Sequence, residues 1–184
     1  MSEVDWMAMP GMKILPTERQ LLYDLAAEVC ARFGDETVIV NIGVARGASL
    51  HCLYAGAPEA RHVAVDIDLG RYPCVNKDAL EGVEFVQADS NLYGLEFEAP
   101  VHLLFVDGCH EFHVVSTDIL AWLPHIPVGG VAAFHDYNPS PEDLARLGAK
   151  LRGVRWAVRR WYVLAQGWAW HDVVGSIIVF RRVR

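Results

Sequence analysis

The chain has 184 residues, the length of a single domain, and a net charge of −7 from 16 basic and 23 acidic side chains. Hydrophobic residues make up 53% of it, which is too large a share for a disordered protein. The acidic balance argues against a nucleic-acid partner, and no apolar run approaches the roughly 20 residues of a membrane span. Four scattered cysteines without a paired motif are typical of a reduced protein, so we expect a cytoplasmic location.

We expect residues 1–16 to form an N-terminal arm and residues 17–184 to form one domain. The first residues carry two acidic side chains and lack the basic region of a signal peptide. A helix is predicted from Thr17, whose hydroxyl can cap it. Leucine, alanine and valine then recur at three- and four-residue spacing until Gly34 ends the pattern.

Short apolar runs then alternate with segments that can form helices. The runs are residues 37–42, 62–66, 83–87, 102–107, 130–135 and 176–180, with a further strand expected near 167–171. The helical segments are 45–55, 114–123 and 141–165, the last broken at Gly148 or Gly153, with a turn or two of helix in 69–82. This alternation predicts an α/β doubly wound sheet whose last two strands form an antiparallel edge hairpin.

The residues where the predicted strands end are polar, with the exception of one glycine. These residues are Asn41, Gly43, Asp66, Asp68, Asp89, Asp107, His110, His135 and Asp136. In a sheet of this kind, ligands bind beyond the carboxyl ends of the strands. Isolated carboxylates are costly to bury at the ends of apolar strands. Their number here therefore indicates a ligand with hydroxyl groups or a cation.

Residues 41–49 form a glycine-rich turn between a predicted strand and a helix. Glycine lets the chain turn sharply and approach a ligand closely, but this turn has Ala45 and Ala48 in place of the second and third glycines of a dinucleotide-binding loop, and it lacks the lysine of a P-loop. Asp66 and Asp68 are placed to accept hydrogen bonds from a ribose diol, and Asp89 from the amine of a base. The alternatives are a helix cap at Asp66 or Asp68 and a simple turn at Asp89.

In this order the motifs resemble those of class I S-adenosylmethionine (SAM)-dependent methyltransferases. The pattern runs from Gly-x-Ala-x-Gly at 43–47 through Asp66 and Asp89 to Val-Asp-Gly-x-His at 106–110 and a final His-Asp at 135–136. With Asp118, Trp122 and Pro-x-Gly-Gly at 127–130, it resembles the branch of macrolide-sugar O-methyltransferases and cephalosporin-hydroxylase-like proteins. The resemblance covers about residues 37–180 and implies a Rossmann-like, seven-stranded sheet, mostly parallel, with an antiparallel last strand.

The resemblance also implies which residues contact the cofactor. They are Asn41, Gly43, Ala45, Gly47, Ser49, Asp66, Asp68, Asp89 and Asp107. The glycines would line the methionine end, Asp66 would hold the ribose and Asp89 would lie by the adenine. The chain departs from the family at Asn41, where many members have an acid, and at Ala45, where glycine is frequent. Asparagine keeps a hydrogen bond to the ammonium but loses the charge, so cofactor affinity is expected to be lower.

Asp107, His135 and Asp136 are expected to hold a divalent cation, Mg²⁺ or Mn²⁺. Related enzymes end this motif in two adjacent acids, so His135 leaves open a softer metal such as Zn²⁺, or no metal with His135 as the base. His110 is the first choice for the general base, because it lies on the loop after the fourth strand and the resemblance implies a base at this position. An unperturbed imidazole is mostly neutral at pH 7 and can accept a proton. A neighbouring Asp107 would raise its pKa, and a bound cation would lower it.

The function predicted is SAM-dependent methyl transfer to a hydroxyl of a small molecule, with no nucleic-acid or membrane partner. A homodimer is one way to complete the substrate pocket, because the chain is short for this branch. Two alternatives remain. A catalytically silent SAM-binding protein with a regulatory or scaffold role would account for Asn41 and His135. A nicotinamide-dependent oxidoreductase is disfavoured by the glycine turn.

Overall fold

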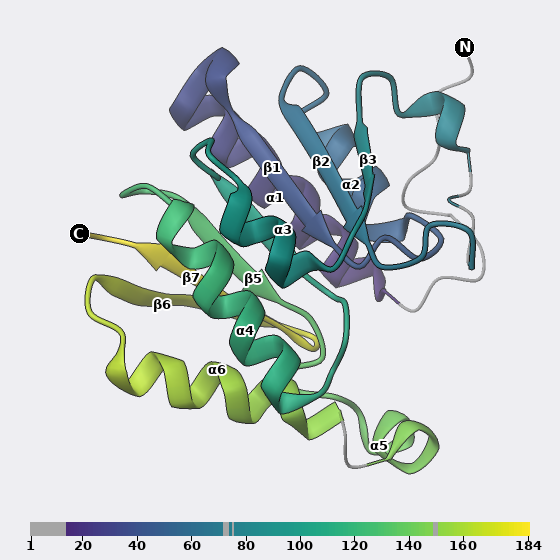
Figure 1. Ribbon diagram of the computed structural model, residues 1–184, viewed down its shortest axis with the longest axis vertical. Helices are drawn as coiled ribbons and strands as arrows, with labels where there is room; N and C mark the ends of the chain where they lie inside the picture. The colour runs from purple at the N-terminus through teal and green to yellow at the C-terminus, as the bar shows by residue number, and fades with distance from the viewer. Residues whose placement is uncertain (1–13, 72–73, 75, 149–150) are drawn as a thin grey trace.

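The computed structural model describes residues 14–71, 74, 76–148 and 151–184. Its centre is one seven-stranded sheet in the order β3-β2-β1-β4-β5-β7-β6 (Figure 1). The strands are β1 Val38–Ile42, β2 Arg61–Asp66, β3 Glu84–Gln87, β4 Leu103–Val106, β5 Val131–Phe134, β6 Trp168–Val174 and β7 Ile177–Arg182. Strands β1 to β5 are parallel, and β7 runs antiparallel to both β5 and β6. This confirms the predicted sheet, including its antiparallel last strand.

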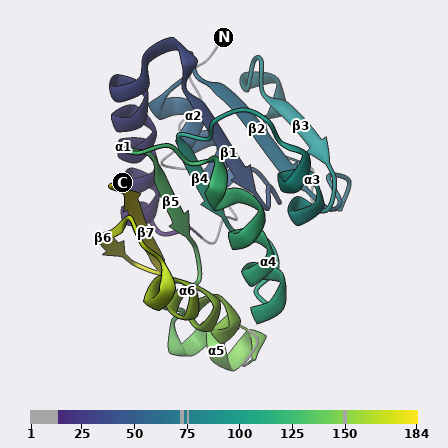
Figure 2. The same ribbon diagram turned by 60° about the vertical axis from the view of Figure 1, so that its left-hand side comes forward.

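Helices cover both faces of this sheet (Figure 2). They are α1 Pro16–Phe33, α2 Ala48–Gly56, α3 Ser90–Glu96, α4 Phe112–Trp122, α5 Pro141–Leu147 and α6 Arg152–Leu164. Helices α1 and α2 pack together on one face, while α4 contacts both α3 and α6 on the other. No helix in the described part of the chain is both long enough and apolar enough to cross a membrane.

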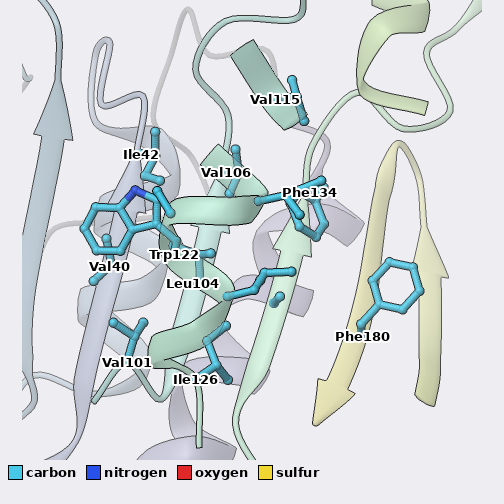
Figure 3. Packing of buried hydrophobic residues seen from close by; sticks show 14 of the residues in the cluster. Val40, Ile42, Val101, Leu104, Val106, Val115, Trp122, Ile126, Phe134 and Phe180 are labelled. Carbon is cyan, nitrogen blue, oxygen red and sulfur yellow. The ribbon is translucent and has the colours of Figure 1, made fainter. Parts of the chain in front are cut away.

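The central strands are buried on both faces, which explains their continuous apolar runs. On the face of α4 and α6, Val40 and Leu104 pack with Trp122 and Phe134 (Figure 3). On the face of α1 and α2, the intervening residues of β1 and β4 pack against the first helix. Two separate cores therefore hold the sheet rigidly, and its carboxyl edge is a fixed platform for side chains.

The structure corrects several helix predictions. Helix α1 begins at Pro16 with Leu15 as its N-cap, so Thr17 is not the cap. Proline suits the first helical position because the backbone N–H missing there has no helical partner anyway. Segment 141–165 is two helices, with Gly148 ending the first. Among the described residues of segment 69–82, the 3₁₀ turn Lys77–Ala79 agrees with the expected turn or two of helix, and residues 1–13 of the predicted arm lie outside the described residues.

Helix α3 was not predicted, and two residues of the sequence motif hold it in place. The Ser90 hydroxyl donates to Asp118 Oδ1 at 2.6 Å, and Trp122 Nε1 donates to the Ser90 carbonyl at 2.9 Å. A Cβ on Gly94 would lie 2.6 Å from Trp122 Nε1, so only glycine allows α3 to approach α4 this closely. Asp118 and Trp122 thus fix the helix that follows Asp89.

Candidate active site

Backbone hydrogen bonds continue the sheet beyond the strand ends and align the predicted site residues. Gly43 N donates to Val65 O at 2.8 Å, Asp107 N to Ile42 O at 2.8 Å, and His135 N to Val106 O at 3.0 Å. These bonds place the ends of β2, β1, β4 and β5 side by side at one edge. The residues that the strand-end rule grouped from four separate segments of sequence therefore lie at one edge of the sheet.

The glycine turn lies directly against the end of β4. Gly43 has a φ of +83°, and a Cβ there would lie 2.2 Å from the Asp107 carbonyl oxygen. Gly47, with a φ of +88°, is the N-cap of α2, and Ala45 also has a positive φ of +43°. The turn thus brings the N-terminus of α2 next to the residues that follow β4.

Asn41 has the geometry expected of a cofactor contact. Its side chain is buried, and its Nδ2 donates to the Gly43 carbonyl at 3.2 Å. Its Oδ1 is buried without a hydrogen-bond partner among the described residues. An unpaired buried acceptor costs about 1–3 kcal/mol, so a donor such as an ammonium group fits here. The first N–H groups of α2, which include that of Ser49, have no helical partners and suit a carboxylate.

Asp66 holds the glycine turn in place. Its Oδ2 accepts from Val44 N at 2.8 Å and Ala45 N at 3.1 Å, and its Oδ1 accepts from Asp68 N at 3.0 Å. A carboxylate has about four acceptor positions, so one remains for a ligand hydroxyl. Asp66 therefore has a structural role that the sequence did not indicate, and its role towards the ribose stays a prediction.

Asp68 and Asp89 each accept local backbone hydrogen bonds, Asp68 in a turn rather than the helix cap given as its alternative, and Asp89 in a helix cap rather than a simple turn. Asp68 Oδ1 accepts from Gly70 N and Arg71 N at 3.0 and 3.1 Å, which closes the turn after β2. Asp89 is the N-cap of α3 and accepts from Asn91 N at 3.1 Å. Both side chains are exposed at the carboxyl edge, so their contacts with a cofactor also stay predictions.

A cluster of two histidines and three carboxylates lies beyond β4 and β5. His110 Nε2 lies 2.8 Å from Asp136 Oδ2 and 3.9 Å from Asp107 Oδ1. His135 Nδ1 lies 3.1 Å from Asp107 Oδ1 and 3.5 Å from Asp136 Oδ2. On its far side, His135 Nε2 lies 3.6 Å from Glu18 Oε2. Sequence analysis placed four of these residues together and missed Glu18.

Burial and charge act in opposite directions on the pKa values of this cluster. Burial would lower the pKa of His135, but the neighbouring carboxylates, Asp107 above all, hold it well above its ordinary value. The same balance raises the pKa of His110 to about 9. Burial would raise the pKa of the Asp107 and Asp136 carboxyls, yet the two imidazoles lower both. Without a cation, the surrounding carboxylates therefore favour the protonated form of both histidines, in contrast to the mostly neutral state of an unperturbed imidazole at pH 7.

The ligand atoms of Asp107, His110 and Asp136 all lie within 4.8 Å of one another, as a metal site requires. The Nε2 of His110 and both ring nitrogens of His135 are buried without a hydrogen bond of good geometry in the described part of the chain. His135 was the predicted ligand, but its ring lies between Glu18 and Asp107, with a carboxylate facing each nitrogen. His110, whose side chain is 28% exposed against 8% for His135, is the better placed of the two.

A family model described as a methyltransferase domain matches residues 40–137, more than half of the chain. The chain belongs to this methyltransferase family. The match spans the glycine turn, Asp66, Asp89 and the whole cluster from Asp107 to Asp136. It confirms the family that the motifs resembled.

Solved structures share the fold of this methyltransferase. An O-methyltransferase from Bacillus cereus in complex with S-adenosylhomocysteine (SAH) is 16% identical, with a TM-score of 0.69 over 94% of this chain and 84% of that one. TomG from Streptomyces achromogenes, an O-methyltransferase of tomaymycin synthesis solved with SAM, is 16% identical, with a TM-score of 0.67 over 99% and 91%. CalS11, the TDP-rhamnose 3′-O-methyltransferase of calicheamicin biosynthesis, is 18% identical, with a TM-score of 0.66 over 91% and 81%.

Proposed function

We propose that this methyltransferase transfers the methyl group of SAM to a hydroxyl of a small molecule. The observation that carries the proposal is the contact between the glycine turn and the acid–imidazole cluster. Gly43 packs so closely on the Asp107 backbone that a cofactor held by the turn ends beside His110 and Asp107. A methyl donor and groups that handle a hydroxyl proton would then share one edge of the sheet. The solved relatives that act on oxygen, one of them on a sugar hydroxyl, support this choice of acceptor.

Different residues at this edge would contact different parts of the cofactor. Asn41 Oδ1 would accept from the methionine ammonium, and the first N–H groups of α2 would bind the carboxylate. Asp66 would use its remaining acceptor position for a ribose hydroxyl, and Asp89 lies where the adenine is expected. The sulfonium supplies an already activated methyl group, so the protein has only to align the hydroxyl and accept its proton.

The protein's own groups set the protonation of the site. Asp107 and Asp136 raise the pKa of the adjacent His110 imidazole, and their carboxylates suit a cationic ligand. Asp107, His110 and Asp136 would hold Mg²⁺ or Mn²⁺, and the imidazole favours Mn²⁺. Such a cation would lower the pKa of a nearby substrate hydroxyl. A His110 that held the cation through Nε2 would lose its proton there and could not also be the general base, so the substrate hydroxyl would release its proton to solvent.

The test combines ligand binding with methyl transfer. SAH should raise the melting temperature of the protein, NADH should not, and Mn²⁺ should add to the effect of SAH. Labelled SAM should then yield a labelled methyl ether with a hydroxylated compound from a panel of sugars and catechols. The yield should fall in EDTA and return with Mn²⁺. SAH binding without transfer to any compound would favour the silent SAM-binding protein, and stabilisation by NADH alone would favour the oxidoreductase.

A further inference from the structure

Glu18 is a carboxylate that neither the sequence motifs nor the proposed function uses. It lies in the first turn of α1 and is 1% exposed. Glutamate is almost never fully buried without a partner. The bonds around it hold it in one orientation. Its Oε1 accepts from Ser176 N at 2.6 Å and from the Ser176 hydroxyl at 2.8 Å, while its Oε2 accepts from Leu15 N at 2.8 Å.

The side of Glu18 that these bonds leave open faces His135. Glu18 Oε2 lies 3.6 Å from His135 Nε2, and the other ring nitrogen lies 3.1 Å from Asp107. The imidazole is therefore held between two carboxylates, one from the first helix and one from the end of β4. Phe105 lies edge-on to the ring at 6.2 Å between centroids. His135 is only 7% exposed, so its ring lies on the buried side of Asp107 and Asp136 rather than on their solvent side.

We infer that Glu18 is a positioning residue of the methyltransferase, which acts through His135 on the Asp107–Asp136 pair. Its charge keeps the His135 ring oriented with Nδ1 towards both aspartates. The ring in turn lies between these two carboxylates and the core, and it orients them towards His110. The inference rests on the proposed function for its consequence in catalysis, but the contact itself is a property of the folded chain.

The packing around Glu18 indicates that a carboxylate is needed there. A Cβ on Gly175 would lie 2.4 Å from Glu18 Oε1, so the turn between β6 and β7 closes directly on the carboxylate. Burial would raise the pKa of Glu18, but His135 and the N–H groups of Ser176 and Leu15 lower it instead. A buried anion is stable only when it is paired and hydrogen-bonded. The pairing partner here is the imidazole of the site.

The experiment compares Glu18→Gln with two matched controls. Glu28→Gln removes a carboxylate from the same helix, one that pairs with Arg181 at 2.8 Å away from the site. Ser176→Ala removes one hydrogen bond to Glu18 and leaves the side facing His135 intact. All variants are checked for melting temperature and SAH affinity. The ring nitrogens of His135 are then followed by NMR in ¹⁵N-histidine-labelled protein, with the signals assigned from His135→Gln.

We expect the His135 ring signals to shift in Glu18→Gln and to stay unchanged in both controls, with SAH affinity unchanged in all three. With a substrate, kcat of Glu18→Gln should fall about 10–100-fold, the range for loss of an outer partner of an active-site ligand. In the background of His135→Gln, the same substitution should cost nothing more. Unshifted ring signals in Glu18→Gln, or equal and additive losses in both backgrounds, would overturn the inference.

Two further results keep the inference testable. If Glu18→Gln does not fold, Glu18→Asp takes its place. It keeps the charge but moves it away from His135 on a shorter side chain, so it should still shift the same ring signals relative to wild type. Unchanged ring signals in Glu18→Asp would then count against the inference. If wild-type protein methylates no compound, the proposed function fails, but the ring signals still decide the role of Glu18.

Discussion

At the scale of single residues, Gly43 of the glycine turn should be especially sensitive to substitution. Gly43 and Gly82 both have a positive φ, +83° and +76°, but only Gly43 has neighbours where a Cβ would go. Gly82→Ala is therefore the matched control for backbone strain. It should cost about 1–2 kcal/mol of the free energy of unfolding. Gly43→Ala should cost a further 1–3 kcal/mol or so and weaken SAH binding, because the turn must leave Asp107. Equal losses in denaturant titrations of the two variants would contradict this packing.

Asp66 should show two separable roles. Asp66→Ala removes every acceptor, so it should weaken SAH binding by about 1.5–3 kcal/mol and also lower the melting temperature. Asp66→Asn keeps one oxygen for Val44 N and Ala45 N, so it should lose less stability for a similar loss of affinity. Calorimetry with SAH and thermal melts of both variants measure the two effects. Unchanged SAH affinity in folded Asp66→Ala would remove Asp66 from the cofactor site.

His110 should make the metal-free protein less stable at alkaline pH. Its pKa is raised to about 9 in the folded state, so its stabilising contribution is complete below about pH 6.5 and lost as the pH rises to about 9. In EDTA, the free energy of unfolding of wild type should fall across this window. The fall should be smaller in His110→Gln. Parallel pH profiles of the two proteins, measured by urea unfolding, would show that His110 is not paired with Asp136.

At the scale of elements, Asp118 connects α3 to α4, and its titration also lowers stability as the pH rises, but in a more acidic range than that of His110. Burial raises its pKa to about 6, partly offset by the Ser90 hydroxyl. The folded state therefore holds a proton that the unfolded chain has released, and stability falls as the pH rises from about 4 to about 6. The free energy of unfolding of Asp118→Asn, taken relative to that of wild type, should therefore be higher at pH 7 than at pH 4 by up to about 3 kcal/mol. A difference in stability that is the same at both pH values would contradict the raised pKa.

The strands and helices differ in how well their sequence predicts them. The central strands β1, β4 and β5 are buried, mostly apolar runs because both of their faces are covered, whereas the edge strands β3 and β6 are partly exposed, and all seven were predicted. Helix α3 has seven residues and includes Gly94, so it is too short to show a helical pattern in the sequence. It depends instead on the hydrogen bonds that Ser90 makes with Asp118 and Trp122. The Thr17 cap was wrong because Pro16 begins α1 and the Glu18 carboxylate accepts from Leu15 N.

At the scale of the whole molecule, topology explains which part of the site was predictable. Strand ends of a parallel sheet meet at one edge, so Asn41, Asp66, Asp107 and His135 could be grouped from sequence. Glu18 could not, because nothing in its local pattern says that the first turn of α1 packs over the end of β5. The same origin explains why His110, and not the predicted His135, lies with Asp107 and Asp136 in the candidate metal site. The side of the sheet to which a side chain points at a strand end depends on contacts with a distant helix.

The central claim is that this edge of the sheet binds SAM, and calorimetric titration with SAH tests it most directly. Metal-free protein should bind one SAH per chain, and NADH should produce no binding heat. Asn41→Ala should bind SAH more weakly, because it removes the buried oxygen that accepts from the ammonium. Folded wild-type protein that binds no SAH at concentrations up to the millimolar range would contradict the account.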